Sequence, residues 1–159
     1  MKPRPADPSE TGVLARLWYD GWQDAHAAVL PAALARARTL ESFAERMAAA
    51  LADVRVIGPQ GAPLGFSMLK GDELYQFYVA SEARGAGIAA ILIADAEAQL
   101  SERGVATAWL ACAVGNARAA KFYQKSGWHL ARTTISRLDT SGGPFDLEVW
   151  RYEKHLARR

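Results

Sequence analysis

Cysteine, long apolar runs and an excess of one charge are all scarce in this chain, and each scarcity argues against a class of protein. A single cysteine, Cys112, excludes an internal disulfide and favours a reducing compartment. No apolar run reaches the roughly 18 residues of a membrane helix and no signal-peptide pattern follows Met1, so we expect a cytoplasmic protein with no membrane partner. The net charge of +2 is too small to predict a nucleic-acid partner.

Metal-ligand spacing is missing as well. The histidines His26, His129 and His155 are scattered, and none has a cysteine or carboxylate partner at ligand spacing, so we predict no metal site. The chain has 159 residues, of which 50% are hydrophobic and 23% are charged. This balance predicts a single globular domain over residues 1–159, with no repeat or linker.

The periodicity of the apolar residues predicts an α/β protein. Strands are expected over 54–57, 64–69, 74–79, 105–112, 128–138 and 145–152, with a short edge strand or irregular entry within 1–8. Helices are expected over 9–23, 39–51, 88–103 and 116–126. This order is typical of a mixed sheet with helices on both faces.

Residues 84–89, Arg-Gly-Ala-Gly-Ile-Ala, connect the strand 74–79 to the helix 88–103. Such a turn points several backbone N–H groups at one place, and the helix N-terminus adds a partial positive charge. Gly85 and Gly87 permit close approach or backbone angles that a Cβ would forbid. The turn therefore indicates a phosphate or pyrophosphate site, or else a mere tight connection, because its spacing is neither GxGxxG nor that of a P-loop.

A second motif, NARAAKFYQKSGW over residues 116–128, reads as a helix with Asn116 as its N-cap and Gly127 as its stop. Together the two motifs resemble those of the GCN5-related N-acetyltransferase (GNAT) superfamily, over about residues 54–152. The family's loop, Arg/Gln-x-x-Gly-x-Gly/Ala, is matched by Arg84, Gly87 and Ala89. Its later helix, Asn-x-x-Ala-x-x-Phe-Tyr-x-x-x-Gly-Phe/Trp, is matched by Asn116, Ala119, Phe122, Tyr123, Gly127 and Trp128.

The resemblance implies both a fold and a co-substrate. The fold is a mixed central sheet of about seven strands, in which the strands flanking the loop helix are parallel neighbours that splay apart. The splay leaves backbone groups of residues 77–79 free to pair with the amides of pantetheine. The implied co-substrate is acetyl-CoA, and the residues implied to bind it are Phe77, Tyr78, Val79, Arg84, Gly85, Ala86, Gly87, Ile88, Ala89, Ala90, Asn116, Ala119, Phe122 and Tyr123.

Acetyl transfer to an amine needs a base for the ammonium proton and an acid for the departing thiolate. Tyr123 matches the family's tyrosine near the CoA sulfur, although a core aromatic beside Phe122 is the alternative. Glu73 starts the strand that enters the loop, at the offset where the histone-acetyltransferase branch carries its base. The alternative for Glu73 is a solvated strand end, and Asp20, Asp24 and His26 are rival bases.

The resemblance implies an acetyl-CoA-dependent N-acetyltransferase, acting on a primary amine by direct attack in a ternary complex. We expect a small-molecule acceptor, because Ala111 stands where ribosomal-protein N-terminal acetyltransferases carry a glutamate base. A peptide or protein acceptor, or a non-catalytic CoA-binding regulatory domain, is the alternative. The residues expected at the acceptor are Trp22, His26, Glu73 and Gln76, with Trp18 and Trp22 serving as pocket wall or core. Family members often pair through their last strands, which would give a homodimer.

Overall fold

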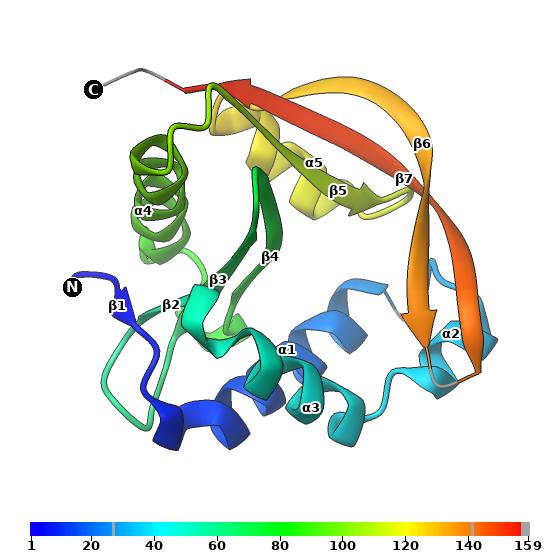
Figure 1. The fold of residues 1–159 in the computed structure, drawn as a ribbon, viewed down its shortest axis with the longest axis horizontal. Coiled ribbons are helices and arrows are strands. Elements are labelled where there is room, and N and C mark those ends of the chain that lie inside the picture. The colour runs from blue at the N-terminus through cyan, green and yellow to red at the C-terminus, as the bar shows by residue number, and fades with distance from the viewer. Residues whose placement is uncertain (27, 141, 157–159) are drawn as a thin grey trace.

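The computed structural model describes residues 1–26, 28–140 and 142–156. Within these residues the strands form one seven-stranded sheet in the order β1-β2-β3-β4-β5-β7-β6 (Figure 1). The strands are β1 (Arg4–Pro5), β2 (Val54–Ile57), β3 (Gly65–Lys70), β4 (Glu73–Val79), β5 (Thr107–Ala113), β6 (His129–Thr140) and β7 (Gly143–His155). The helices are α1 (Thr11–His26), α2 (Ala32–Ala37), α3 (Leu40–Ala50), α4 (Ile88–Glu102) and α5 (Ala117–Lys125).

The helices cover both faces of the sheet, as expected for this class. Side chains alternate across a strand, so neighbouring residues enter different cores. One core joins α1 and α3 to one face of β2 and β3, through Leu14, Trp18, Phe43, Met47, Val54, Val56, Phe66 and Met68. The other joins α4 and α5 to the opposite face, through Leu69, Leu74, Ile93, Ala96, Leu100, Leu110 and Ala120.

The central strands β4 and β5 are parallel and splay apart, which confirms the expected split sheet. Glu73 pairs with Trp109, and the Trp109 amide donates to the carbonyl of Asp72 at 3.3 Å. No other register pair joins β4 to β5 within the described ranges, and Figure 1 shows the two strands running apart. The Ala80 amide donates to the carbonyl of Leu64, on the β3 side of β4, at 2.7 Å. By strand alternation, the backbone groups of Val79 and Phe77 then face the open side of the split.

An extra residue bends β4 beside this split. The register changes from Met68 opposite Gln76 to Leu69 opposite Leu74, which leaves Tyr75 as the inserted residue of a β-bulge. Strand alternation puts Gln76 on the same face as Tyr78, and both side chains extend toward α1.

The predicted elements match the structure apart from their ends and one helix. Thr39 caps α3 by accepting from the Ser42 amide at 3.1 Å, and Asn116 caps α5 by accepting from the Ala119 amide at 3.4 Å. The short helix α2 was not predicted, because its Ala- and Arg-rich sequence has little apolar periodicity. The last two strands are longer than predicted, since they form one hairpin that runs from residue 129 to residue 155.

Candidate active site

A cavity of about 490 Å³ opens where β4 and β5 separate. It is walled by α1 and α2 on one side, by the loop before α4 and by α5 on the other, and by the β6–β7 hairpin. Every residue predicted for the site lines this cavity except Ala86. Segments far apart in the sequence therefore meet at one place, on both sides of the split.

The loop before α4 has the geometry of an anion cradle. Gly85 and Gly87 have φ values of +82° and +78°, which L side chains rarely adopt, and a Cβ on either would meet no atom within 4 Å. Gly87 is the N-cap of α4 and supplies no side-chain cap. The first N–H groups of a 15-residue helix are thus left for an outside acceptor, next to the cavity that Ile88, Ala89 and Ala90 line.

Two arginines flank this cradle and share one carboxylate. Arg84 Nη2 lies 2.8 Å from Asp24 Oδ2, and Arg118 Nη2 lies 2.9 Å from the same oxygen. These hydrogen bonds lower the pKa of Asp24, that from Arg84 most. The three side chains are between 39% and 58% exposed, so the ion pairs are weak and exchangeable. Arg118 was not singled out in the sequence, although it falls in the first turn of the motif helix.

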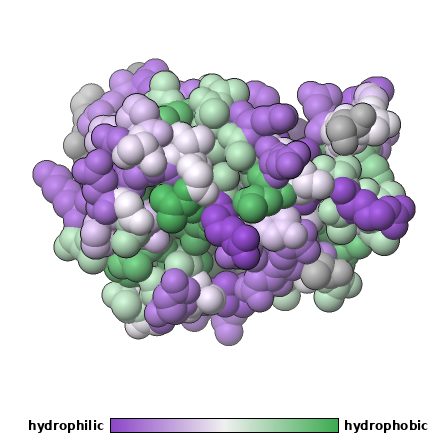
Figure 2. Space-filling view, turned by 90° about the horizontal axis from the view of Figure 1, so that it is seen from below, coloured by the Kyte–Doolittle hydropathy of each residue, from purple (hydrophilic) through white to green (hydrophobic). Residues whose placement is uncertain are grey.

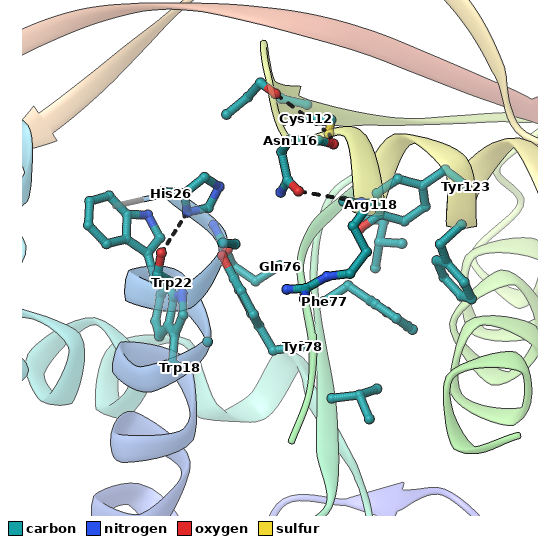
Figure 3. A pocket seen from close by; sticks show the side chains of 18 of the residues that line it. Trp18, Trp22, His26, Gln76, Phe77, Tyr78, Cys112, Asn116, Arg118 and Tyr123 are labelled. Atoms are coloured by element: carbon teal, nitrogen blue, oxygen red, sulfur yellow. Dashed lines mark hydrogen bonds between the residues drawn. The ribbon is translucent and has the colours of Figure 1, made fainter. Parts of the chain in front are cut away.

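Tyr123 projects from α5 into the cavity (Figure 3). Its ring contacts Phe77, Phe122 and Trp128, with ring centroids 5.6–6.4 Å away. Burial first, and then the neighbouring Cys112 and Tyr78, raise the pKa of its phenol above the usual range. The hydroxyl has no hydrogen-bond partner among the described residues. It is therefore a protonated donor without a partner, facing the open side of β4.

The side chains of β4 divide the cavity into two halves. Figure 3 shows Gln76 and Tyr78 extending toward Trp22 and His26 of α1, while Phe77 extends the other way, toward α5. Phe77 stacks on Phe122 with centroids 5.5 Å apart. Tyr78 packs across α1 at Gly21, where a Cβ would come within 2.6 Å of the Tyr78 ring. The two halves are thus a Phe77 side, next to the anion cradle, and a Tyr78 side, next to α1.

Glu73 lies at the first residue of β4, where β4 and β5 still pair. Its carboxyl is half-buried and has no hydrogen-bond partner in the described part of the chain. Desolvation raises its pKa from 4.5 to about 7, against the opposing effect of Lys70, while Asp72 raises it further. A carboxylate with this pKa is half-ionised near neutral pH, as a general base should be.

His26 is a second group on the cavity wall that can accept a proton near neutral pH. Its Nδ1 lies 3.0 Å from the carbonyl oxygen of Trp22, which can only accept, so Nδ1 carries the hydrogen and Nε2 is the free acceptor. Burial lowers the pKa of His26, with partial compensation from that hydrogen bond. The imidazole is therefore neutral at pH 7.

The remaining rival bases lie elsewhere. Asp20 is exposed and pairs with Arg16 on its own helix at 3.2 Å, and neither it nor Asp24 belongs to the described lining of the cavity. Cys112 is buried, and desolvation raises the pKa of its thiol to about 12, so it is not a nucleophile. Ala111 lines the cavity and places no carboxylate there.

Trp18 and Trp22 belong to the core and to the cavity wall at once. Both are buried, and both pack on Phe43, with centroids at 4.8 Å and 5.9 Å. Both also line the cavity. The two interpretations left open by the sequence are therefore compatible.

Besides Arg118, two further arginines of the cavity wall were not predicted from the sequence. Arg46 falls three residues after Phe43, on the buried stripe of α3, and this charged position within an apolar stripe could have drawn attention to it. Arg38 lies in the connection between α2 and α3, where no periodic signal exists.

Features of other kinds of functional site were sought over the rest of the described residues. In the described ranges, no helix is long and apolar enough to cross a bilayer, and no three His, Cys, Asp or Glu side chains are grouped as metal ligands. On the face shown in Figure 2, hydrophobic side chains gather in separate groups between hydrophilic ones.

The sequence and the fold were compared with those of known proteins. Residues 14–128 match the model of the acetyltransferase (GNAT) family. No curated protein sequence gives a significant match.

Several solved structures are similar over nearly the whole chain. A GCN5-related N-acetyltransferase from Rhodopseudomonas palustris is 22% identical, with a TM-score of 0.75 over 97% of this chain and 94% of that one. PaiA N-acetyltransferase from Thermoplasma acidophilum, solved in complex with coenzyme A, is 17% identical, with a TM-score of 0.73 over 97% and 98%. A ribosomal-protein-alanine N-acetyltransferase from Brucella melitensis is 21% identical, with a TM-score of 0.71 over 98% and 100%. At these identities the likeness shows a shared fold.

Proposed function

The chain belongs to the acetyltransferase (GNAT) family and is thereby an acyl-CoA-dependent N-acetyltransferase; we propose that it acetylates a primary amine of a small molecule, by direct attack in a ternary complex. Glu73 serves as the base and Tyr123 as the acid in this proposal. The observation that supports it most is that one cavity, where β4 and β5 separate, is lined both by a carboxyl group with a pKa of about 7 and by an unpartnered phenol.

The described residues suit acetyl-CoA on three counts. The open edge of β4 at Phe77 and Val79 offers backbone groups to the amides of pantetheine. The glycines of the loop leave open space above the uncapped start of α4, which suits a pyrophosphate. Arg84 and Arg118 can exchange Asp24 for phosphate oxygens, because their ion pairs with Asp24 are exposed.

The bound co-substrate supplies an acetyl thioester, and the protein's own groups handle the protons. Ionised Glu73, directly or through a water, takes the proton of the acceptor ammonium. Neutral His26 offers Nε2 as a second acceptor on the α1 side. The Tyr123 phenol, whose pKa burial holds above that of a thiol, stays protonated and donates a hydrogen bond to the departing thiolate.

A small acceptor is favoured over a peptide by what the cavity lacks. Ala111 leaves the cavity without the glutamate that the resemblance implies for N-terminal acetylation of ribosomal proteins. Aromatic walls at Trp18 and Trp22 suit a compact acceptor.

The test is an amine screen with acetyl-CoA, followed through the release of free thiol. The panel contains polyamines, aminoglycosides, amino acids and short peptides with free N-termini. We expect kcat/KM values for one of the small amines above those of every peptide. Higher values for peptides would replace the small acceptor with a peptide. Tight binding of acetyl-CoA with no release of thiol for any amine would favour a non-catalytic CoA-binding domain.

The assembly and location of the protein complete the proposal. β6 is one of the two edge strands of the sheet and exposes Leu130 and Ile135, and two copies could pair along it as a homodimer. Sedimentation at several concentrations tests this pairing. Cys112 is a free thiol, which is compatible with the proposed cytoplasmic location.

A further inference from the structure

Arg38 is a buried arginine without an acidic partner. The residue is 6% exposed and lines the cavity at the end of α2. Its Nη1 donates to the backbone carbonyl of Asp139 at 3.0 Å, and its other donors have no partner among the described residues. The Asp139 carboxylate interacts with it electrostatically but forms no ion pair within 4.0 Å. A buried guanidinium satisfied by one carbonyl is an expensive arrangement unless another group completes it.

Arg46 lies on the same side of the cavity and also lacks an acidic partner in the described part of the chain. Its guanidinium stacks 4.3 Å from the Trp18 ring and donates to the Tyr75 hydroxyl at 3.0 Å. Burial disfavours the charged form of Arg38 most, and the positive charge of Arg46, which lines the same cavity, disfavours it further. A shared anion would offset both effects.

The other charges on the cavity wall do not supply that anion. Among the described lining residues, the arginines are Arg38, Arg46, Arg84 and Arg118, and Glu73 is the one carboxylate. Asp24 already pairs with Arg84 and Arg118, at the cradle side. Glu73 interacts with Lys70, Asp72 and Arg151 rather than with Arg38 or Arg46. Arg38 and Arg46 therefore face the cavity as an unbalanced positive pair.

We propose that Arg38 and Arg46 bind an anionic oxygen group, a carboxylate or a phosphate, carried by the amine acceptor. The inference rests on the proposed acetyltransferase function and narrows its acceptor to compounds that hold an amine and an oxyanion. A guanidinium presents a planar fork of N–H donors that matches the oxygens of both groups. Trp18 and Tyr75 hold the Arg46 fork in place, and the carbonyl of Asp139 holds that of Arg38.

This arrangement would also orient the acceptor. The two arginines come from the α2–α3 side of the cavity, whereas Glu73 and Tyr123 lie at the split between β4 and β5. An acceptor anchored by its oxyanion on the arginine side would extend its amine toward the split. Binding energy from a part of the acceptor that does not react would thereby position the part that does.

The first experiment compares matched acceptors through the release of thiol from acetyl-CoA. Each amino acid is paired with its carboxamide, and each aminoalkyl phosphate with the corresponding alcohol. We expect at least one anionic amine to exceed its neutral counterpart by roughly tenfold to a hundredfold in kcat/KM, the range typical of a hydrogen bond to a charged group. The two pairs distinguish a carboxylate from a phosphate. Polyamines or neutral amines as the best acceptors would overturn the proposal.

The second experiment uses variants of the arginines. Arg46→Met should bring the ratio between the anionic amine and its neutral counterpart close to one, and Arg46→Lys should restore part of it, since lysine keeps the charge without the fork. Arg38→Met should have the same effect. If the Arg38→Met protein does not fold because the contact with Asp139 is lost, the test rests on Arg46→Met. The control is Arg36→Met, an exposed arginine of α2 that does not line the cavity, and it should leave the ratio unchanged.

Binding of the anionic amine, measured by calorimetry in the presence of CoA, separates this inference from the proposed function. Without thiol release from any amine, the acetyltransferase proposal fails, and weaker binding to Arg46→Met than to wild type still supports an anion site. If thiol is released but the ratio is the same in wild type and Arg46→Met, the anion site is refuted while the acetyltransferase stands. Equal binding of the anionic amine to wild type and Arg46→Met, or no binding to either protein, also refutes the anion site.

Discussion

Replacement of Glu73 by glutamine tests the base through a pH window that the structure defines. The wild-type carboxyl has a pKa of about 7 in the fold, so about a tenth of it is ionised at pH 6 and about nine tenths at pH 8. A primary amine has a pKa of about 10 and needs a base below that value. The ratio of wild-type to Glu73→Gln kcat/KM should therefore rise through pH 7, stay high to about pH 10, and fall above it.

The expected height of this ratio is about 10²–10⁴, the usual contribution of a general base. Initial rates are measured from pH 5.5 to pH 10.5 with saturating acetyl-CoA and a subsaturating amine. Glu45→Gln is the matched control, because Glu45 is exposed on α3 and lies outside the cavity lining. A ratio that does not change with pH would move the base to another group, and His26→Gln would be the next variant.

The melting temperature tests the raised pKa of the Glu73 carboxyl without any substrate. Its pKa is raised in the fold from 4.5 to about 7, so between these values the folded state binds more protons than the unfolded state and stability falls as pH rises. At pH 8 the ionised group carries a penalty of at most about 3 kcal/mol, reduced by partial exposure to about 1–2 kcal/mol. Glu73→Gln should then melt roughly 2–6 °C above wild type at pH 8 and close to it at pH 4. Equal melting temperatures at both pH values would show that Glu73 is not desolvated.

Three further changes test other parts of the site. Tyr123→Phe should lower kcat by at least roughly tenfold while the Kd for acetyl-CoA from calorimetry stays within about twofold, because only the proton donor is lost; an unchanged kcat would leave Tyr123 a packing residue. Gly87→Trp should abolish binding of acetyl-CoA, whereas Gly104→Trp, at a φ of +84° with equally open space but outside the cavity lining, should bear the same backbone strain and keep it; equal affinities in the two variants would contradict the cradle. Asp24→Asn should tighten binding of CoA by about twofold to fivefold at low salt, since it frees Arg84 and Arg118 for phosphates; weaker binding would mean that Asp24 holds the two arginines in place.

The structure of the loop before α4 and of α5 could largely be predicted from the sequence because it is local. The φ values of Gly85 and Gly87, and the cap that Asn116 supplies, depend on residues within one turn of the chain. The motifs that contain them therefore predicted the loop and the helix α5 correctly. Ala86 belongs to the same loop but does not line the cavity.

The rest of the cavity wall was predicted less completely, because it is assembled by contacts between distant segments. Arg38 meets Asp139 across 101 positions of the chain, and Arg46 meets Tyr75 across 29. Neither contact leaves a periodic pattern in the sequence. Asp24 likewise pairs with Arg84 and Arg118, which come from two other parts of the chain. These contacts, which argue against Asp24 as the base, exist only in the folded protein.

The sequence by itself determined the order of the elements and the glycine turn before α4, since these follow from local conformational preference, and its resemblance to the GNAT family implied Glu73 and Tyr123 as candidates. Tertiary structure alone decided where β4 and β5 part, because sheet register places their single described pair at Glu73 and Trp109. It also decided that Glu73 has a pKa near 7, because that value comes mainly from desolvation. Burial and long-range pairing depend on the whole fold, and they convert a set of candidate residues into one site.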